Sequence, residues 1–227
     1  MAKKRSKRYI EAEKLVDKKK VYSLKDAVAA FKKMPQTKFN QTVGLSFNLN
    51  IDPKKSDQLI RGTVSLPHGS GKSVRVAVFC KGEEEKAAKA AGADIIGGLE
   101  LIEKVAGGFM GFDAAVATPD IMKDLSRLGK VLGPKGLMPS PKTGTVTVNV
   151  GQAVRDIKGG KIEFKTDKQA GLHVGIGKLN FSESQILENA SKVMEAIQQA
   201  RPQSVKGIFI KSVSIYSSMS PGMRLAL

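Results

Sequence analysis

The amino-acid sequence predicts a mixed α/β and α+β protein in which one domain is inserted into another. Two clusters of turn-forming residues, at 67–71 and at 159–160, divide the chain into three segments. In the middle segment apolar strands alternate with helical patterns, which favours a parallel sheet covered on both faces. We therefore expect a discontinuous α+β two-layer domain at 1–68 and 159–227, and an inserted three-layer α/β (Rossmann-like) domain at 69–158.

The first outer segment begins with a charged stretch and continues into a helix. Residues 3–20 fit either a short amphipathic helix or a flexible basic arm, and the pattern leaves both open. A helix is expected from Leu24 to Phe31, because Ser23 can cap its start and Pro35 ends it.

The strands of the outer segments alternate apolar residues with small or polar ones. This period of two predicts a half-buried strand at 42–49, and 63–66 is interpreted as its short partner. After residue 160 we expect strands at 161–165, 172–176 and 208–217, with an amphipathic helix at 182–200 capped by Ser182.

The middle segment repeats strand and helix in turn. Its apolar runs and amphipathic patterns predict strands at 74–80, 93–96, 112–117 and 145–150, and helices at 83–91, 99–105, 119–132 and 152–157.

The positive charge of the chain is concentrated in the outer segments. Of the net charge of +17, residues 1–68 carry +10 and residues 159–227 carry +4, whereas the middle carries only +3. A basic surface built from both ends of the chain favours a polyanionic partner. Aromatic residues make up only 5% of the chain, which argues against serial base stacking but not against shape recognition of folded RNA.

Several classes of protein lack support in the sequence. No apolar run reaches the length of a membrane span, and the basic start is not followed by the apolar region of a secretory signal. One cysteine and two histidines indicate neither a disulfide nor a metal site, and no cofactor is expected. Residues 69–73 (GSGKS) match only the end of a phosphate-binding loop and precede a strand, so a hinge is the preferred interpretation. The sequence therefore predicts a protein that is not an enzyme.

Two clusters in the outer segments suit contact with RNA. The first, residues 38–42, combines a lysine, an aromatic ring and small polar groups; the alternative is that Phe39 enters the core. The second consists of Ser212 and residues 217–224, where hydroxyl groups and Met219 could meet a ribose-phosphate backbone. The alternative for the second cluster is a frayed, serine-rich tail. A nucleotide-binding enzyme and a non-specific DNA-binding protein remain as alternative functions.

A turn-rich loop at 133–146 (GPKGLMPSPKTGTV) is the most distinctive motif of the chain. It resembles the signature loop of the uL1 family of large-subunit ribosomal proteins, of bacterial or organellar type. Other matching segments follow in order: Lys38-Phe39 before Thr42-Val43, then 51–53, 56–58, 61–69, 92–94 and 117–120.

This resemblance implies a function that the residue patterns alone do not. A member of the family is expected to have the two-domain fold and to bind, in the large subunit, the rRNA of the mobile stalk beside the tRNA exit site. It is expected to assist release of deacylated, exit-site tRNA and to repress its own operon through a leader mRNA that mimics the rRNA. We further expect a cytoplasmic protein that is monomeric when free and has no membrane partner. The inserted domain is expected to swing on the two turn-rich hinges at 67–71 and 159–160.

The resemblance also implies which residues contact rRNA. Matching positions are Lys38, Phe39 and Thr42 in the first cluster, Ser212, Ser218, Met219 and Ser220 in the second, and Asp167, Lys168 and His173 near a further strand pair. The family usually has glycine where this chain has Ser220, so either the backbone there avoids positive φ or the approach to RNA is less close. In the signature loop Ser140 replaces the more common asparagine.

Overall fold

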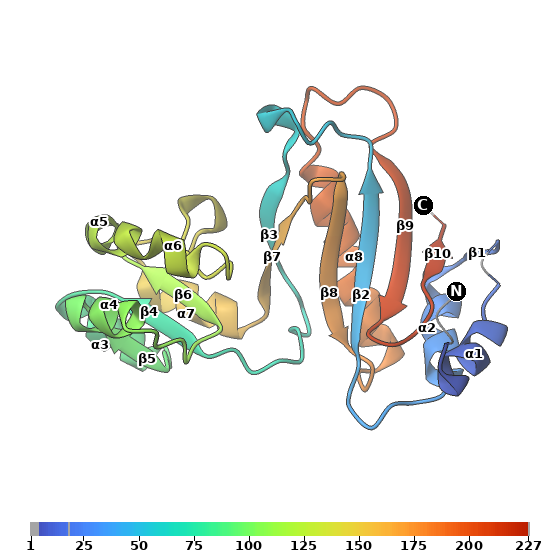
Figure 1. Cartoon of the computed structure of the whole chain (residues 1–227), viewed down its shortest axis with the longest axis horizontal. Helices are drawn as coiled ribbons and strands as arrows, with labels where there is room; N and C mark the ends of the chain where they lie inside the picture. The colour runs from blue at the N-terminus through green and yellow to red at the C-terminus, as the bar shows by residue number, and fades with distance from the viewer. Residues whose placement is uncertain (1–4, 18, 227) are drawn as a thin grey trace. The chain divides into compact units, whose positions relative to one another are not determined.

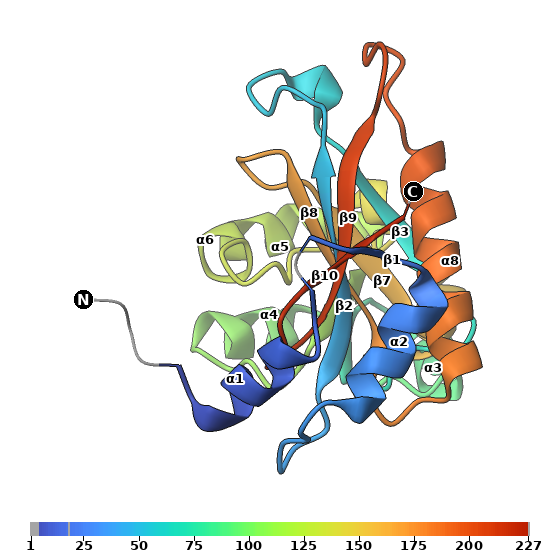
Figure 2. The ribbon, with the colours of Figure 1, turned by 90° about the vertical axis from the view of Figure 1, so that its right-hand side faces the viewer.

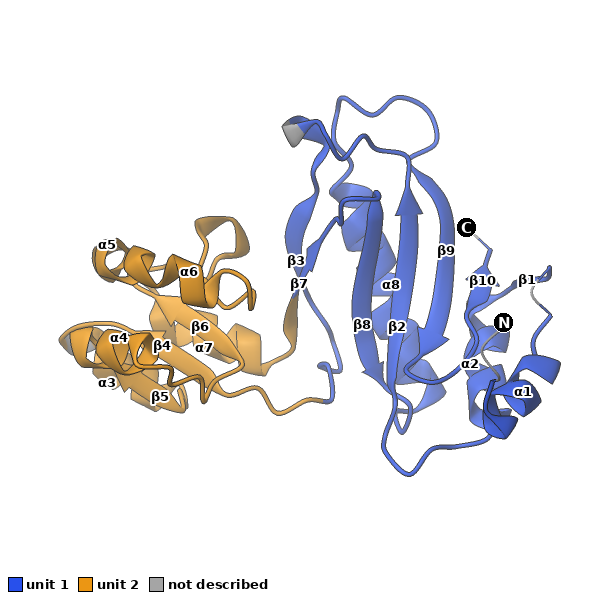
Figure 3. Ribbon diagram, in the orientation of Figure 1, with its two compact units in different colours: residues 1–71, 163–227 blue, residues 72–162 orange. Residues whose placement is uncertain are grey.

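The structure, a computed structural model, describes residues 5–17 and 19–226. Long-range contacts divide the chain into two units, residues 1–71 with 163–227 (unit 1) and residues 72–162 (unit 2) (Figure 3). Helices and strands occur in both units, so the mixed α/β class predicted from the sequence is confirmed.

A five-stranded sheet forms the centre of unit 1 (Figure 1). Its order is β1 (Val21–Tyr22), β10 (Met223–Leu225), β9 (Ile210–Ser217), β2 (Thr42–Leu49) and β8 (Gly171–Lys178). Strand β1 runs parallel to β10, and the other neighbours are antiparallel. The first and last parts of the chain are therefore hydrogen-bonded side by side.

Two helices, α2 (Leu24–Lys33) and α8 (Glu183–Gln199), cover one face of this sheet (Figure 2). Each begins at the serine predicted to cap it, and Ser182 forms a full capping box with Gln185. The alternate residues of β2 that face these helices, Val43, Leu45, Phe47 and Leu49, are at most 1% exposed. The period of two in the sequence therefore marks the true core face.

The N-terminal stretch is helical in its described part. Helix α1 (Lys7–Lys14) is capped by Ser6 and buries Ala12, whereas Ile10 and Leu15 stay exposed. Of the two alternatives for 3–20, the helix is therefore correct over these residues; residues 3, 4 and 18 lie outside the described ones. Figures 1 and 2 place α1 on the side of the sheet opposite α2 and α8.

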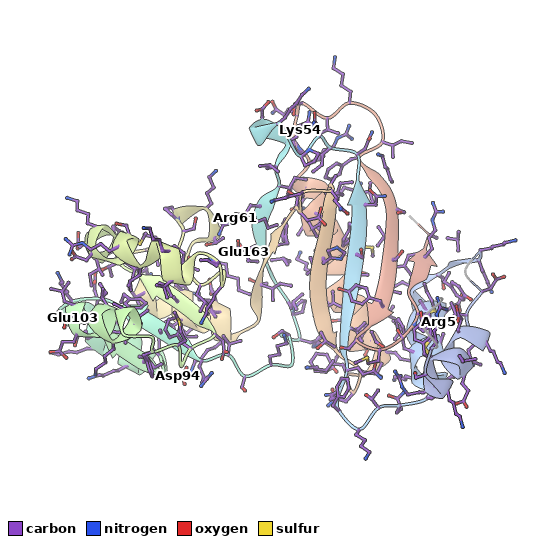
Figure 4. All side chains as sticks on the ribbon, in the orientation of Figure 1. Arg5, Lys54, Arg61, Asp94, Glu103 and Glu163 are labelled. Atoms are coloured by element: carbon purple, nitrogen blue, oxygen red, sulfur yellow. The ribbon has the colours of Figure 1, made fainter. Side chains whose placement is uncertain are left out.

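The predicted pairing of 63–66 with the strand at 42–49 is wrong. Strand β2 has β8 on one edge and β9 on the other, so no edge is free. Strand β3 (Arg61–Ser65) instead pairs with β7 (Lys161–Lys165). The Arg61 guanidinium meets the Glu163 carboxylate at 2.5 Å, and Figure 4 shows the two side chains beside each other.

Unit 2 has a parallel sheet between two helical layers. The strand order is β5 (Ile95–Gly97), β4 (Val76–Phe79) and β6 (Ala114–Ala117). Helix α4 (Leu99–Ala106) shares a buried cluster with one face of the sheet. Residues of α3 (Glu83–Ala90) and α7 (Val150–Lys158) form a second cluster with the other face.

Two predictions for the middle segment are wrong in detail. The expected helix at 119–132 consists of four short pieces: η2 (Pro119–Ile121), α5 (Met122–Leu125), η3 (Ser126–Leu128) and α6 (Gly129–Leu132). Gly129, a poor helix former, starts the last of these. The expected strand at 145–150 contributes only a bridge between Val146 and Ala117, because α7 already begins at Val150.

The signature loop folds on its own backbone. Thr143 is buried and donates to the Ser140 carbonyl at 3.0 Å, while the Ser140 N–H donates to the Thr145 hydroxyl at 2.9 Å. Gly144 closes the short helix η4 (Pro141–Thr143) with φ of 66°. The hydrogen bonds at Ser140 in this loop thus come from its backbone N–H and carbonyl. They are compatible with a residue other than the more common asparagine at this position.

The unit boundaries lie after 71 and 162, a few residues beyond the predicted 68 and 158. Residues 68–69 remain in unit 1 because the buried Asn189 of α8 accepts from the His68 N–H and donates to the Gly69 carbonyl. Lys161 remains in unit 2, where its ammonium lies 3.7 Å from the Asp156 carboxylate.

Cys80 is expected to be unreactive in the folded protein. Its side chain is fully buried at the end of β4, and burial raises the pKa of the thiol to about 11, with Glu85 and Glu84 adding to the shift. An aromatic disulfide reagent at pH 8 should label native protein at least about 100-fold more slowly than urea-unfolded protein. Similar rates in both states would contradict this burial.

Candidate nucleic-acid interface

A buried glutamine joins the two clusters that the sequence singled out. Gln41, 3% exposed, immediately precedes β2. Its side-chain oxygen accepts a hydrogen bond from the Ser217 hydroxyl at 2.8 Å and another from the Met219 N–H at 3.1 Å. The turn after β9 is therefore fixed against the start of β2.

Thr42 and Ser218 strengthen this junction. The Thr42 N–H donates to the Ser218 hydroxyl and the Ser218 N–H donates to the Thr42 carbonyl, each at 3.0 Å. The Lys178 ammonium, at the end of β8, donates to the Thr42 hydroxyl at 3.0 Å. Residues 38–42 and 217–220, some 176 positions apart, thus form one surface that we call the junction.

The apolar side chains of the junction point outward. Phe39 is 51% exposed and Met219 is 48% exposed, so the alternative that Phe39 enters the core is wrong. Lys38 is also exposed. An open hollow of about 500 Å³ lies beside the Phe39 ring and is lined by Lys32 and by residues 36–41 and 179–181. A cation, a ring and hydroxyl groups are thus presented together.

Ser220 fits the turn without backbone strain. Among the described residues other than glycine, only Ala170 has a positive φ, so Ser220 does not need the conformation that favours glycine. Its hydroxyl accepts from the Ser217 N–H at 2.9 Å and donates to the Pro221 carbonyl at 3.1 Å. The following residues form β10, so the alternative of a frayed tail is wrong through Leu225.

The remaining predicted residues lie toward the other end of the sheet. Ser212 is opposite Asn48, six residues along β9 from Ser218, which corresponds to about 20 Å. The Asp167 carboxylate accepts from the N–H groups of Gly171 and Gln169 at 2.7 and 2.8 Å, and these bonds lower its pKa. Its oxygen atoms thus shape the hairpin.

His173 and Lys168 complete this second group. The His173 imidazole is 58% exposed and lies 3.9 Å from the Asp167 carboxylate, and Lys168 is exposed in the hairpin. The structure therefore places the ten predicted residues in two groups on unit 1, with the junction at one end of the sheet.

The open face of the sheet links the two groups with polar side chains that the sequence analysis missed. One row crosses four strands through His173, Ser46, Ser214 and Arg224. In a neighbouring row the Tyr216 ring lies over Gly44. A Cβ atom added at Gly44 would lie only 2.9 Å from atoms of the Tyr216 side chain. The alternation of Ser212, Ser214 and Tyr216 in the sequence was a usable signal for this face.

Unit 1 carries most of the positive charge. It contains 24 basic and 11 acidic residues, against 14 and 10 in unit 2. The junction and the open face therefore belong to a unit with a net charge of +13, which attracts a polyanion.

The described residues give little support for a phosphate-binding loop, a metal site or a membrane span. Residues 69–73 lead toward strand β4 instead of a helix, so they do not form a phosphate-binding loop. Among the residues that the structure describes, no group of three or more metal-ligating side chains comes together. No described helix combines the length and apolar character that a membrane crossing requires.

Comparisons with known proteins agree on one family. The model of the "Ribosomal protein L1p/L10e family" matches residues 28–221. "Large ribosomal subunit protein uL1" of Beutenbergia cavernae is 51% identical over 97% of this chain and 92% of its own length. The protein of the same name from Bifidobacterium longum is 52% identical over 97% of this chain and 96% of its own length.

These comparisons bear directly on two predictions. The family is a structural, non-enzymatic ribosomal component, so the prediction that the chain is not an enzyme is confirmed. The resemblance to uL1 proteins is confirmed as well. The chain belongs to the ribosomal protein L1p/L10e family.

Proposed function

We propose that this chain is a constituent of the large ribosomal subunit in the cytoplasm and binds the rRNA of the mobile stalk beside the tRNA exit site. The observation that carries the proposal is the junction, where Gln41 fixes exposed Met219 beside residues 38–42. The names of the bacterial relatives support the ribosomal location.

Recognition would rest on shape and on the sugar-phosphate backbone. Lys38 and Lys178 supply positive charge for phosphates, and Thr42 and Ser218 place hydroxyl groups near riboses. Phe39 and Met219 supply apolar contacts to unstacked bases. Thr42 and Lys178 lie on strands, and hydrogen bonds with Gln41 and Thr42 fix the turn that carries Ser218 and Met219, so little ordering is needed on binding.

Two further activities follow from the same surface. The protein would assist the release of deacylated tRNA from the exit site, because it would hold the stalk beside that tRNA. It would also repress its own operon by binding a leader mRNA that presents the same RNA shape. As a free protein it would be monomeric and would have no membrane partner.

A non-specific DNA-binding protein is the competing interpretation of the charge. It predicts equal affinity for duplex DNA and folded RNA at matched salt, with a steep salt dependence for both. The proposed function instead predicts a preference of several kcal/mol for the stalk fragment over an unrelated hairpin.

Phe39→Ala is expected to weaken binding to the stalk rRNA fragment by roughly tenfold or more, because stacking of a ring on a base contributes about 1–3 kcal/mol. Met219→Ala is expected to weaken it by a similar factor, because the apolar surface that a base would cover is lost. Both side chains are about half exposed, so thermal unfolding should change little. Filter binding and calorimetry on each variant measure the two effects.

Ile208→Ala is the matched control. Ile208 is 74% exposed but lies in the loop before β9, away from the junction. Its replacement should leave the affinity unchanged. Equal losses of affinity in all three variants would show that the assay reports non-specific binding of RNA to the protein surface. That outcome would count against the junction as the binding site.

A further inference from the structure

A second concave surface adjoins the junction, on the side of helix α1. It is an open groove of about 340 Å³ lined mainly by Arg5, Arg8 and Tyr9 on one wall and by Ser218, Met219 and Ser220 on the other. Both walls belong to unit 1. Met219 therefore lies between two sites: its backbone N–H bonds to Gln41 in the junction, and the residue also lines the groove beside α1.

The α1 wall is arranged by an ion pair. The Glu13 carboxylate accepts two hydrogen bonds from the Arg5 guanidinium, at 2.5 and 2.6 Å. This pair holds the guanidinium 5.2 Å from the centre of the Tyr9 ring, and Figure 4 shows Arg5 beside α1. The Arg5 charge is thus balanced by Glu13, and the Tyr9 ring is held in place.

Arg8 differs from Arg5 in its partners. Within the part of the chain that the structure describes, no carboxylate pairs with Arg8. A guanidinium without a protein partner suits bidentate contact with a phosphate. The groove therefore offers a cation, a ring, a thioether and two hydroxyl groups, which together suit a nucleotide and not an apolar ligand.

We propose that this groove binds one unstacked nucleotide of the same RNA, next to the segment that the junction holds. Arg8 contacts its phosphate, and Tyr9 and Met219 contact its base. The proposal rests on the RNA-binding function proposed above and extends the site beyond the two predicted clusters. The family match starts at residue 28 and so does not include the α1 wall.

The first test compares two variants of α1, each of which lacks one positive charge: one inside the groove and one outside it. Arg8→Gln should weaken binding to the stalk rRNA fragment on the order of tenfold and reduce the slope of log K against log salt by about 0.7–0.9, the value for one phosphate contact. Lys14→Gln removes an equal charge from the exposed last turn, outside the groove, and should change the affinity by less than about twofold. Arg8→Lys should recover part of the loss.

The second test uses fluorescence, because the chain contains no tryptophan. Tyr9→Trp places the only indole in the groove, and a base stacked on it should quench its emission when RNA binds. Ile208→Trp places an indole at the far, exposed loop and should show no comparable quenching. Circular dichroism of each variant checks that α1 and the sheet are intact.

The possible outcomes distinguish the groove proposal from the proposed rRNA-binding function. If the wild-type protein prefers the stalk fragment but Arg8→Gln matches Lys14→Gln and the Tyr9→Trp emission is unchanged, the groove is not a nucleotide site and the proposed function stands. If the wild-type protein shows no preference for the stalk fragment, the proposed function itself fails. If Arg8→Gln and Lys14→Gln both weaken binding tenfold, α1 acts only through its general charge and the groove proposal is wrong.

Discussion

Gln41→Met is expected to weaken binding to the stalk rRNA fragment by about 100-fold, although Gln41 itself is buried and does not reach the RNA. Methionine has a similar length but offers no comparable acceptor, so the Ser217 hydroxyl and the Met219 N–H lose their partner. Each buried, unpaired polar group costs about 1–3 kcal/mol, and the turn at 217–220 relieves this cost by moving away. Exposed Met219 then leaves the position in which we propose that it contacts RNA.

Hydrogen exchange at the Met219 amide is the direct readout of this effect. Exchange should become faster in Gln41→Met, together with the loss of affinity. The control is Gln203→Met, because Gln203 is exposed in the loop between α8 and β9, at the other end of unit 1. Wild-type affinity in Gln41→Met with a loosened turn would show that the turn is not part of the interface.

Asn189→Ala is expected to lower the free energy of unfolding by about 3 kcal/mol. Asn189 is fully buried on α8, and its amide donates to the carbonyls of Ile176 at 2.7 Å and of Gly69 at 3.1 Å. Its oxygen accepts from the His68 N–H at 3.2 Å. Alanine leaves these backbone groups unpaired and opens a small cavity, and both effects are destabilising.

Urea unfolding monitored by circular dichroism measures this change, and amide exchange shows where it acts. The His68 amide should lose protection, because Asn189 fixes the segment through which the chain leaves unit 1. The matched control is Asn50→Ala, at an exposed position in the same unit, which should stay within about 0.5 kcal/mol of wild type. A loss below about 1 kcal/mol in Asn189→Ala would contradict the assigned role.

Much of the secondary structure could be predicted because its causes are local. Ser23 and Ser182 cap helices within three residues of themselves, and the alternation at 42–49 reports which side of one strand is buried. Two errors, the helix expected at 119–132 and the strand expected at 145–150, had local causes, but the wrong strand pairing arose where the cause was distant. The partner of β3 is β7, about 100 residues away, and the short β10 exists only because β9 and β1 lie on its two sides.

The interface shows the same division. The charge distribution indicated a polyanion-binding surface in the outer segments, and the resemblance to uL1 proteins implied residues in both clusters. The contribution of Gln41 could not be found, because an isolated glutamine in a sequence carries no sign of burial. The open-face residues Ser214 and Tyr216 could have been found from their alternation with the core residues of β9.

Composition, periodicity and capping residues are properties of neighbouring positions, so they suffice to predict the α/β class, the non-enzymatic character and the basic outer segments. The junction needs more, because its two halves are 176 residues apart and meet only when β2 and β9 are paired in one register. Burial of Gln41 and the exposure of Phe39 and Met219 follow from that pairing, whereas Asn189 is buried where α8 meets Ile176 of β8 and residues 68–69. The surface proposed to bind RNA is thus a product of tertiary structure, since hydrogen bonds between distant strands decide which side chains are presented together.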